Sequence, residues 1–398
     1  LLNLPIDIFM KSLALDQGEK SIGIILSGTG SDGMQGIRSI KEAGGMAMVQ
    51  DKDTAKFDGM PKSALSTGLI DFVLPPEDMP EQLIAYLKHP LVSKQMVAEQ
   101  ILTDEDNLTK IFTILNKKKN IDFTYYKRST LMRRIQRRLS VNHIKDLSEY
   151  VQLLTNSDNE VGILQREFLI GVTNFFRDKE VFQQLENKYI KNLVKRKDGG
   201  DIRVWVAGCS SGEEAYSIAM LFIEAIEKLK VNVTLKIFAT DIDDNAIFRA
   251  GQGIYPESIA ADIPSDYMAK YFQKKNDTYQ VSRKIRESVI FAQHNLINDP
   301  PFTNIDFISC RNLLIYLQAG LQQKVIDLFS FSLNNNGILL LGKSESIGKM
   351  SEFYQQLHHK LKIYSYNGNR NVSILNKIDQ GFVKSTTSAR TYGSRGRQ

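Results

Sequence analysis

Apolar runs of strand length alternate with stretches of helical periodicity over much of the chain, and this alternation predicts parallel α/β structure. The run from Ile202 to Ala207 predicts a buried strand. Small residues follow it, and two acids, Glu213 and Glu214, begin a predicted helix. Residues 235–243 predict the next strand. A strand, a tight turn, a helix and a second strand form one unit of an open sheet.

The first 90 residues show a similar alternation. Residues 22–26 predict a buried strand, residues 34–43 a helix and residues 46–50 a second strand. Because strand, helix and parallel strand connect in a right-handed sense, these elements predict half of an open α/β sheet.

The pattern is helical from residue 91 to about residue 179, and its most charged stretch lies at residues 125–140. Apolar side chains recur there every three or four residues, which predicts a helix with one face in the core. The stretch also carries six cations, Lys127, Arg128, Arg133, Arg134, Arg137 and Arg138. Such a basic face is either a solvated surface or a docking site for an acidic partner.

Two later stretches break the α/β pattern. Between about residues 251 and 291, Gly, Pro, Asp and short alternating runs predict a small β-rich insertion. Residues 367–398 are rich in Ser, Thr, Gly, Lys and Arg, which predicts a disordered linker.

The turn after the strand at residues 202–207 has the composition of a nucleotide-cofactor loop. Gly208, Ser210, Ser211 and Gly212 let the backbone turn tightly and approach a ligand. A dinucleotide would place its pyrophosphate on a helix start that carries no fixed negative charge. Glu213 occupies this helix start, so S-adenosylmethionine, which carries a cationic group, is favoured. An ordinary strand–turn–helix of another α/β protein is the alternative.

Six motifs in the second half of the chain stand in the order and spacing of one family. They are residues 205–220, 239–243, 253–255, 294–296, 308–316 and 341–346. Through them, residues from about 107 to 366 closely resemble the chemotaxis receptor methyltransferases of the CheR family. The resemblance implies a Rossmann-like, S-adenosylmethionine-dependent methyltransferase domain with a small β-rich insertion, after an N-terminal helical domain. It also implies a protein-glutamate O-methyltransferase that modifies the cytoplasmic helical region of chemotaxis receptors or related sensors and leaves S-adenosylhomocysteine.

The first segment resembles the C-terminal half of the CheB methylesterases, through residues 28–33 and 57–61. The resemblance implies a partial α/β methylesterase-like domain, in which Asp32 is the residual member of a serine hydrolase triad. The serine and histidine of that triad are not expected within these 398 residues, so we expect no esterase activity from this chain. Alternatively, Asp32 caps the helix that begins near Gly33.

The predicted domains follow from both resemblances. Residues 1–90 form the partial methylesterase-like domain and residues 91–179 the helical domain. Residues 180–366 form the methyltransferase domain, with its insertion at about 251–291, and residues 367–398 form the linker. The chain starts at Leu1 without a methionine, which suggests a fragment of a longer product.

The CheR resemblance assigns cofactor binding to a set of polar residues and one leucine. The set comprises Thr173, Arg177, Glu213, Asp241, Asn295, Leu296, Arg311 and Asn312. Physically, Asp241 at a strand end suits ribose hydroxyls, and Asp243 on the same strand exit is the alternative. Glu213 suits the cationic end of the cofactor, and Asn295 suits the adenine edge.

Methylating a glutamate makes modest chemical demands. Its carboxyl has a reference pKa of about 4.3 and is ionised at pH 7, so neither a general base nor a metal is expected. Placement of the carboxylate against the methyl donor matters more, because positioning can lower the activation barrier by at most about 7 to 11 kcal/mol. Arg177 can hold a carboxylate by two hydrogen bonds, and Tyr316 can offer a phenolic hydroxyl. A surface arginine and an aromatic core residue are the respective alternatives.

The resemblance also assigns substrate docking to the basic helix. Its docking residues would be Arg133, Arg134, Arg137 and Arg138, which would meet the acidic methylation region of a receptor.

The composition limits the class of protein and the kinds of partner that are expected. A hydrophobic fraction of 42% excludes a disordered chain. The net charge of +6 allows an acidic partner, but no aromatic stacking platform accompanies the basic residues, so nucleic acid is not expected. The chain lacks a membrane-length apolar run and a signal peptide, so we expect a cytoplasmic protein with a monomeric catalytic domain and no membrane insertion.

Two other functions remain open from the sequence. One is a non-catalytic signalling scaffold that senses S-adenosylmethionine, although Arg177 and Tyr316 argue against it. The other is a bifunctional methylesterase and methyltransferase in a longer parent protein.

Overall fold

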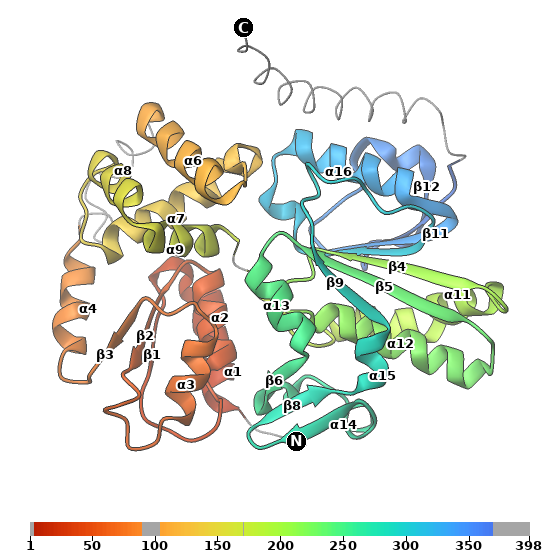
Figure 1. Cartoon of the computed structure of the whole chain (residues 1–398), viewed down its shortest axis with the longest axis horizontal. Coiled ribbons are helices and arrows are strands. Elements are labelled where there is room, and N and C mark those ends of the chain that lie inside the picture. The colour runs from red at the N-terminus through yellow and green to blue at the C-terminus, as the bar shows by residue number, and fades with distance from the viewer. Residues whose placement is uncertain (1–3, 90–103, 170, 369–398) are drawn as a thin grey trace, which may run out of the picture. The chain divides into compact units, whose positions relative to one another are not determined.

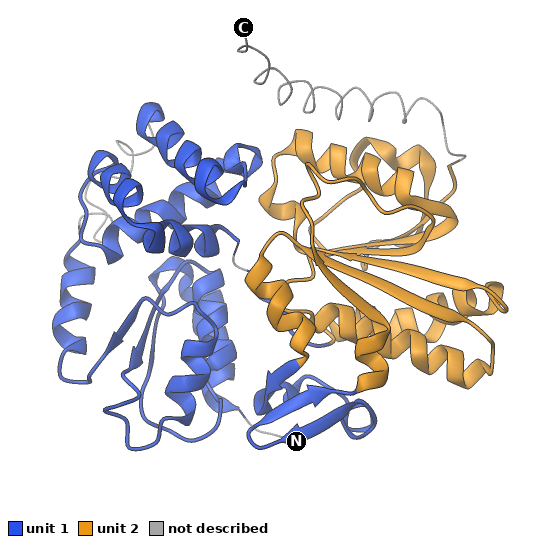
Figure 2. Cartoon of the chain, viewed as in Figure 1, with its two compact units in different colours: residues 1–175, 254–282 blue, residues 176–253, 283–398 orange. Residues whose placement is uncertain are grey.

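The computed structural model describes residues 4–89, 104–169 and 171–368, which fall into two compact units (Figure 2). The first unit comprises residues 1–175 and 254–282, and the second comprises residues 176–253 and 283–398. Residues 91–103 of the predicted helical domain and nearly all of the predicted linker at 367–398 lie outside the described residues.

The second unit is built on a seven-stranded sheet in the order β12-β13-β11-β10-β4-β5-β9 (Figure 1). The strands are β4 (Asp201–Ala207), β5 (Thr234–Asp241), β9 (Val289–Gln293), β10 (Ile305–Cys310), β11 (Leu333–Leu341), β12 (Tyr354–His358) and β13 (Ile363–Tyr366). Strands β9, β5, β4, β10 and β11 are parallel, whereas β13 runs antiparallel to β11 and β12. The strands predicted at residues 202–207 and 235–243 are confirmed as β4 and β5, and β5 ends at Asp241.

Helices accompany this sheet in the second unit. They are α10 (Lys179–Gln184), a π-helical turn (Leu185–Ile190), α11 (Lys191–Arg196), α12 (Glu213–Leu229), α13 (Asp244–Gln252), α15 (Arg283–Glu287) and α16 (Ala319–Ser332). Every residue of β10 is buried, as expected for a central strand covered on both faces. Trp205 on β4 is fully buried, and its ring meets those of Phe302 and Phe329 edge-on. The indole N–H donates to Oγ1 of Thr240 on β5 at 2.9 Å.

The N-terminal segment, residues 4–89 of the first unit, contains the parallel sheet β1-β2-β3. Its elements are α1 (Pro5–Gln17), β1 (Ile22–Ile25), α2 (Met34–Glu42), β2 (Met46–Gln50), α3 (Gly59–Ser66), β3 (Phe72–Leu74) and α4 (Met79–Lys88). The predicted strand, helix and strand are thus confirmed. Its core joins Met10 of α1, Ile37 and Ile40 of α2, and Val49 of β2.

The helical segment, residues 104–169, consists of α6 (Glu105–Lys119), α7 (Arg128–Val141), α8 (Leu147–Asn156) and α9 (Asp158–Phe168). The side chains of Asp104, Asp146 and Ser157 cap three of these helices by accepting backbone hydrogen bonds. Helix α7 is the basic helix predicted at residues 125–140.

A small antiparallel sheet of order β6-β8-β7 corresponds to the predicted β-rich insertion. It comprises β6 (Ile254–Pro256), β7 (Phe272–Lys275) and β8 (Thr278–Val281), with α14 (Ser265–Tyr271) before β7. The ring of Phe175 packs edge-on against Tyr255 and Phe272, at 4.9 and 5.4 Å between centroids. The small sheet ends at Val281, and β9 belongs to the large sheet.

Candidate active site

The turn between β4 and α12 is shaped by left-handed backbone. Gly208, Ser210 and Gly212 have φ angles of 72°, 49° and 92°. A side chain at Gly212 would bring its Cβ to 2.8 Å from Cβ of Ala250, and one at Gly208 would bring its Cβ to 2.9 Å from Leu313. Both glycines are therefore required by conformation and by close packing.

This turn lies where the strand order of the large sheet reverses. Strand β4 has β5 on one side and β10 on the other, so the chain proceeds outward in both directions from β4. In open α/β sheets, ligands bind at such a point, outside the carboxyl ends of the strands. Parallel strands end at the same edge, so this edge carries the residues that follow β4, β5, β9 and β10.

Asp241 ends β5 and is bonded to the turn after β4. Its Oδ2 accepts the N–H of Ser210 at 2.8 Å, and its Oδ1 accepts the N–H of Asp243 at 3.0 Å. Burial raises the pKa of the Asp241 carboxyl, although these backbone hydrogen bonds act in the opposite direction. A carboxylate has about four acceptor positions, so the two backbone bonds leave capacity for ligand hydroxyls.

Asp243 has a different task at the same strand exit. Its Oδ1 accepts the N–H groups of Asn245 and Ala246 at 3.0 and 3.3 Å, so it caps α13. Of the two acids, Asp241 is the one that is hydrogen-bonded to the turn at residues 208–212, which is called the cofactor turn below.

Glu213 begins α12 and is only 2% exposed. The hydroxyl of Ser211 lies 2.9 and 2.7 Å from the two carboxylate oxygens and donates to the carboxylate. The helix N-terminus favours a negative charge at this position. A fixed acid here disfavours a pyrophosphate and suits a cationic group.

The turn after β9 carries Asn295 and Leu296, which are both half-buried. The backbone of this turn is tied to β5, because the N–H of His294 donates to the carbonyl of Asp241 at 2.9 Å. Oδ1 of Asn295 accepts the N–H of Ile297 at 2.9 Å, so the amide orientation is set locally.

Arg311, which follows β10, is 6% exposed and lies among acids. Its Nη1 donates to Glu214 at 2.9 Å, and its Nη2 donates to Asp178 at 2.6 Å and to the carbonyl of Arg177 at 3.1 Å. Burial alone would raise the pKa of Asp178, but a hydrogen bond from Lys343 and the charge of Arg311 lower it overall. Arg311 therefore fixes the backbone at Arg177 to the first turn of α12.

Glu345 is a buried acid that organises the loop after β10. Its Oε2 accepts the N–H groups of Gly342 and Asn312 at 2.6 and 3.2 Å. Its Oε1 accepts those of Leu314 and Ile315 at 2.7 and 3.4 Å. Burial raises the pKa of Glu345, while these four bonds favour its charged form. The carboxylate thus joins the end of β11 to the loop that carries Asn312 and Tyr316.

The two predicted catalytic residues both belong to the second unit. Arg177 follows Phe176, whose N–H donates to Oγ of Ser217 on α12 at 3.1 Å. Tyr316 is half-buried, and it ends a short 3₁₀ turn at Leu314–Tyr316 that Glu345 holds. Thr173 is buried and belongs to the first unit.

Comparison with known proteins identifies the domain around this edge. A family model described as "CheR methyltransferase, SAM binding domain" matches residues 171–363, and "CheR methyltransferase, all-alpha domain" matches residues 106–169. A chemotaxis protein methyltransferase of Borreliella burgdorferi is 33% identical over 61% of this chain and 89% of its own length. Chemotaxis protein methyltransferase 2 of Vibrio cholerae is 32% identical over 64% of this chain and 90% of its own length. The chain belongs to the CheR methyltransferase family.

The CheR part is preceded by a methylesterase-like part, since the model described as "CheB methylesterase" matches residues 2–83. An uncharacterised 104.1 kDa protein of Rhodobacter capsulatus is 38% identical over 92% of this chain. The chain spans 40% of the length of that relative. The resemblances to CheR and to CheB are both confirmed.

The CheR domain is a methyltransferase domain that binds S-adenosylmethionine. The residues at the switch point fit this cofactor. Neighbouring residues leave no room for a side chain at Gly208 or Gly212, so the backbone of the turn stays bare. Asp241 offers a carboxylate that backbone N–H groups hold in place, and Glu213 supplies a buried negative charge.

The arginines assigned to docking lie differently from the prediction. Arg134, Arg137 and Arg138 on α7 are 4%, 5% and 4% exposed, whereas Arg133 is exposed. Arg137 pairs with Asp71 and Glu167, and Arg138 donates to Glu160 at 2.9 and 2.7 Å. The expectation that all four arginines present an exposed basic face is therefore wrong for three of them. Helix α7 packs against the other helices of its segment and also against the N-terminal segment, so more than one of its faces is buried. Periodicity along a single helix does not reveal a second contact of this kind.

Asp32 of the CheB-like part is a helix cap, but not of the predicted helix. Its Oδ2 accepts the N–H of Ile6 at 3.1 Å and its Oδ1 accepts that of Asp7 at 2.9 Å, so it caps α1. The N-cap residue of helix α2 is Gly33, which has no side chain that could cap the helix. Instead, Asp7 accepts the N–H of Gly36 at 2.7 Å and caps α2 from α1.

Three acids at the methyltransferase edge had no predicted role: Glu345, Glu214 and Asp178. Glu345 lies in a recognised motif at residues 341–346, and its place in that motif is the sequence signal that could have found it. Glu214 and Asp178 depend on the position of Arg311, which no local pattern discloses.

Within residues 4–89, 104–169 and 171–368, no three His, Cys, Asp or Glu side chains form a group that could hold a metal ion. Among the same residues, none of the helices combines the length and apolar character needed to cross a bilayer.

Proposed function

We propose that the chain is a protein-glutamate O-methyltransferase that transfers a methyl group from S-adenosylmethionine to glutamate side chains of chemotaxis receptors or a related sensor. The observation that carries the proposal is the bond between Ser210 and Asp241, which fixes an acid against the cofactor turn in a CheR-family chain. The acceptor glutamates would lie in the cytoplasmic helical region of the receptor, and the reaction would take place in the cytoplasm with a monomeric catalytic domain.

The cofactor would be held by residues of the four strand exits. Asp241 would accept the ribose hydroxyls, Glu213 would face the cationic methionine end, and Asn295 with Leu296 would contact adenine. Support comes from the backbone bonds that preset the side chains of Asp241 and Asn295. Asn312 would complete the site from the loop after β10, and Thr173 keeps its predicted cofactor role.

Arg311 would act on the cofactor site indirectly. Its two terminal nitrogens already donate to Glu214 and Asp178, so its contribution is to hold α12 and the backbone at Arg177 in place. A guanidinium enclosed by two acids is a strong, directional support.

The acceptor chemistry needs orientation without proton removal. When bound, the cofactor supplies an electrophilic methyl group on a sulfonium sulfur. A carboxylate oxygen of the acceptor forms the new O–C bond as the S–C bond breaks, which gives a methyl ester and S-adenosylhomocysteine. Arg177 would hold the acceptor carboxylate by its guanidinium, and Tyr316 would donate its phenolic hydroxyl.

Receptor docking would use what α7 leaves exposed. Arg133 remains a candidate contact for an acidic helical partner, together with Lys127 and Arg128, which are exposed at the start of the helix. Arg134, Arg137 and Arg138 are buried, so the proposal assigns them no receptor contact.

The test is transfer of a labelled methyl group from S-adenosylmethionine to a purified receptor cytoplasmic fragment, scored as methanol released by alkali. Base-labile label identifies a carboxyl methyl ester and is the expected result. Absence of label, with cofactor binding intact by calorimetry and with several receptor fragments tried, would refute receptor methylation. Absence of cofactor binding would refute the site assignment as well.

A further inference from the structure

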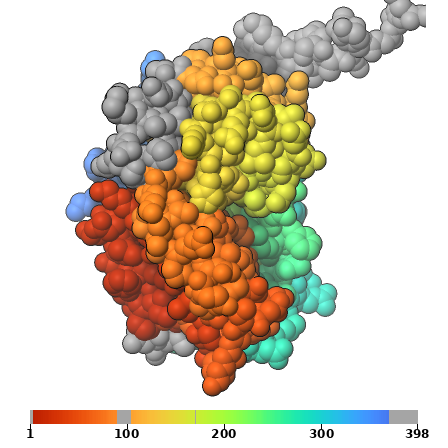
Figure 3. Space-filling model, turned by 90° about the vertical axis from the view of Figure 1, so that its left-hand side faces the viewer, coloured from red at the N-terminus to blue at the C-terminus, as the bar shows by residue number. Residues whose placement is uncertain are grey.

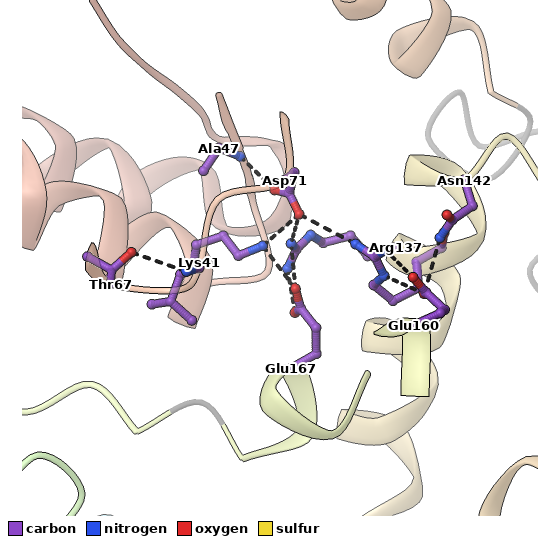
Figure 4. Close-up of polar contacts among 10 residues, drawn as sticks. Lys41, Ala47, Thr67, Asp71, Arg137, Asn142, Glu160 and Glu167 are labelled. Atoms are coloured by element: carbon purple, nitrogen blue, oxygen red, sulfur yellow. Dashed lines mark hydrogen bonds and ion pairs between the residues drawn. The ribbon is translucent and has the colours of Figure 1, made fainter. Parts of the chain in front are cut away.

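A closed ring of four buried charges joins the N-terminal segment to the helical segment within the first unit (Figure 4). Nζ of Lys41 lies 2.8 Å from Asp71 and 3.0 Å from Glu167. Arg137 donates to both oxygens of Glu167 at 2.8 and 2.9 Å, and it also pairs with Asp71. Each charge in the ring therefore contacts two charges of opposite sign within the ring, and Asp71 also lies 3.9 Å from Arg138 on α7.

Each segment contributes one cation and one anion. Lys41 lies on α2 and Asp71 directly before β3, whereas Arg137 lies on α7 and Glu167 on α9. The Lys41–Asp71 and Arg137–Glu167 contacts are internal to a segment, and the other two contacts cross between segments. The two charges that each segment contributes cancel, so the segments are not held together as a basic surface against an acidic one. Their fit requires that each cation of one segment faces the anion of the other.

The ring is out of contact with water. The exposed fractions of its side chains are 0% for Lys41, 1% for Asp71, 4% for Arg137 and 6% for Glu167. Buried charges are tolerated only when they are paired, and removing one partner leaves the others uncompensated. Moving the helical segment away from the N-terminal segment would separate Arg137 from Asp71 and Lys41 from Glu167 at the same time, and would leave no ring intact.

Apolar and neutral polar contacts continue the interface around the ring. Val141 of α7 packs in one cluster with Met46, Met48, Met79 and Tyr86 of the N-terminal segment. His89 makes hydrogen-bond contacts with the carbonyl of Ile144 at 3.0 Å and with the hydroxyl of Ser140 at 3.1 Å. In the space-filling view, the surfaces of the N-terminal segment (red to orange) and of the helical segment (yellow) adjoin (Figure 3).

We propose that the α7–α9 face is a specific docking surface for the N-terminal segment, which serves this chain as a fixed structural partner of the helical segment. This role requires no ester hydrolysis. It agrees with Asp32, whose two carboxylate oxygens both hold the start of α1. The proposal does not depend on methyl transfer, so either can fail alone.

Hydrogen exchange in the full chain tests the docking. Asp71→Asn keeps the size of the side chain and removes one charge of the ring. We expect amide exchange in α7 and α9 to accelerate at least tenfold, although the substitution lies in the other segment. Asp58→Asn is the matched control, because Asp58 pairs with Lys62 on the surface with a side chain 44% exposed. Its effect should stay below twofold. Acceleration confined to residues 41–74 in the Asp71→Asn variant would overturn the proposal.

A double variant tests the ring as a unit. Lys41→Met with Asp71→Asn removes one positive and one negative charge, so Arg137 and Glu167 can still neutralise each other. We expect exchange in α9 to be at least tenfold slower than the product of the two single effects predicts. Purely multiplicative effects would show that the charges act independently and would overturn the ring as the selecting feature.

A third measurement avoids single variants that fail to fold. A protease site is introduced between residues 95 and 96 of the full chain, and the cleaved protein is passed over a sizing column at about 0.1 and 0.5 M salt. The two pieces should elute together at both concentrations, because buried ion pairs are little screened. Separation of the unsubstituted pieces at either concentration would overturn the proposal.

Discussion

The backbone N–H of Ser210 donates a hydrogen bond of 2.8 Å to Oδ2 of Asp241, which lies 31 positions later in the chain. The bond joins the turn after β4 to the end of β5. The carboxylate that would receive the ribose is therefore positioned by the main chain of the turn that would surround the cofactor. A change at Asp241 should alter both the ligand contact and the turn.

Replacing Asp241 by asparagine should weaken cofactor binding strongly. The amide nitrogen cannot accept, so one of the N–H groups of Ser210 and Asp243 loses its acceptor, and the ribose loses a charged partner. A hydrogen bond to a charged group contributes about 1.5 to 3 kcal/mol, so the Kd for S-adenosylmethionine should rise roughly 10- to 150-fold. Titration calorimetry measures it.

The control for Asp241→Asn is Asp243→Asn on the same strand exit. Asparagine caps a helix about as well as aspartate, so α13 should persist and the Kd should change less than about twofold. Equal weakening by both substitutions would contradict the assignment of the ribose to Asp241.

Arg177→Ala should reduce methyl transfer more than cofactor binding. If the guanidinium holds the acceptor carboxylate, its removal abolishes two charge-assisted hydrogen bonds to the acceptor. Cofactor binding does not depend on these two bonds. We expect kcat/KM for the acceptor to fall at least about 100-fold, with a change in cofactor Kd below about fivefold. Arg177→Lys should recover only part of the rate, because an ammonium group cannot form the same planar pair.

Tyr316→Phe gives the companion measurement for Arg177→Ala. Loss of one neutral hydroxyl should lower kcat/KM by about tenfold and leave cofactor affinity unchanged. Equal losses of rate and cofactor affinity in Arg177→Ala would make Arg177 chiefly a cofactor residue.

Glu345→Gln should impair the reaction although Glu345 is a positioning residue. Glutamine has one acceptor oxygen where glutamate has two, so either the Gly342 and Asn312 pair or the Leu314 and Ile315 pair loses its acceptor. We expect kcat/KM to fall about 10- to 100-fold because the loop that carries Tyr316 loosens. Steady-state kinetics and a melting curve together measure the effect.

Two controls separate positioning by Glu345 from general stability. Glu352→Gln makes the same chemical change at an exposed position and should alter neither quantity. Ile338→Val removes one buried methylene from β11, lowers stability by about 1 kcal/mol and should leave kcat/KM intact. Loss of rate in Ile338→Val equal to that in Glu345→Gln would reduce the role of Glu345 to stability.

Much of the fold was predictable because the strands of a parallel sheet are buried on both faces. The apolar run of residues 204–207 in β4 is buried throughout and follows directly from that burial. Strand β5 is buried only in part. The cofactor turn was predictable from Gly208 and Gly212, since its backbone requires positive φ angles. These features depend on residues close together in sequence.

The features that sequence could not predict depend on distant partners. In the sequence, Arg137 cannot be told apart from a solvated arginine on the polar face of a helix. It is a buried ion-pair residue because the fold places Asp71 and Glu167 beside it. Asp32 was considered as a cap of the helix near Gly33, but it caps α1 through the N–H groups of Ile6 and Asp7, which lie 26 and 25 positions earlier in the chain. Tertiary packing decides such partners, and helical periodicity contains no information about them.

Asp7 and Asp32 form a reciprocal pair of caps that makes the first unit sensitive to pH. Asp32 accepts the N–H of Asp7, while the Asp7 carboxylate accepts the N–H of Gly36 at the start of α2. Burial raises the pKa of Asp7 from 3.8 to about 6, and the charge of Asp32 adds to the effect. Between these values the folded state binds more protons than the unfolded state, so the free energy of unfolding falls as the pH rises.

Asp7→Asn should remove this pH dependence. Asparagine keeps an acceptor for Gly36 but carries no charge, so the variant should be more stable than the parent above pH 6. The shift of the Asp7 pKa to about 6 corresponds to a gain of about 3 kcal/mol. At about pH 3 and below the two proteins should converge, because the parent carboxyl is then protonated in both states. Calorimetric melting of the first unit between pH 4 and 7 measures the difference. Asp16→Asn, at an exposed position on the same helix, should follow the parent curve. An Asp7→Asn curve parallel to that of the parent would place the titrating group elsewhere.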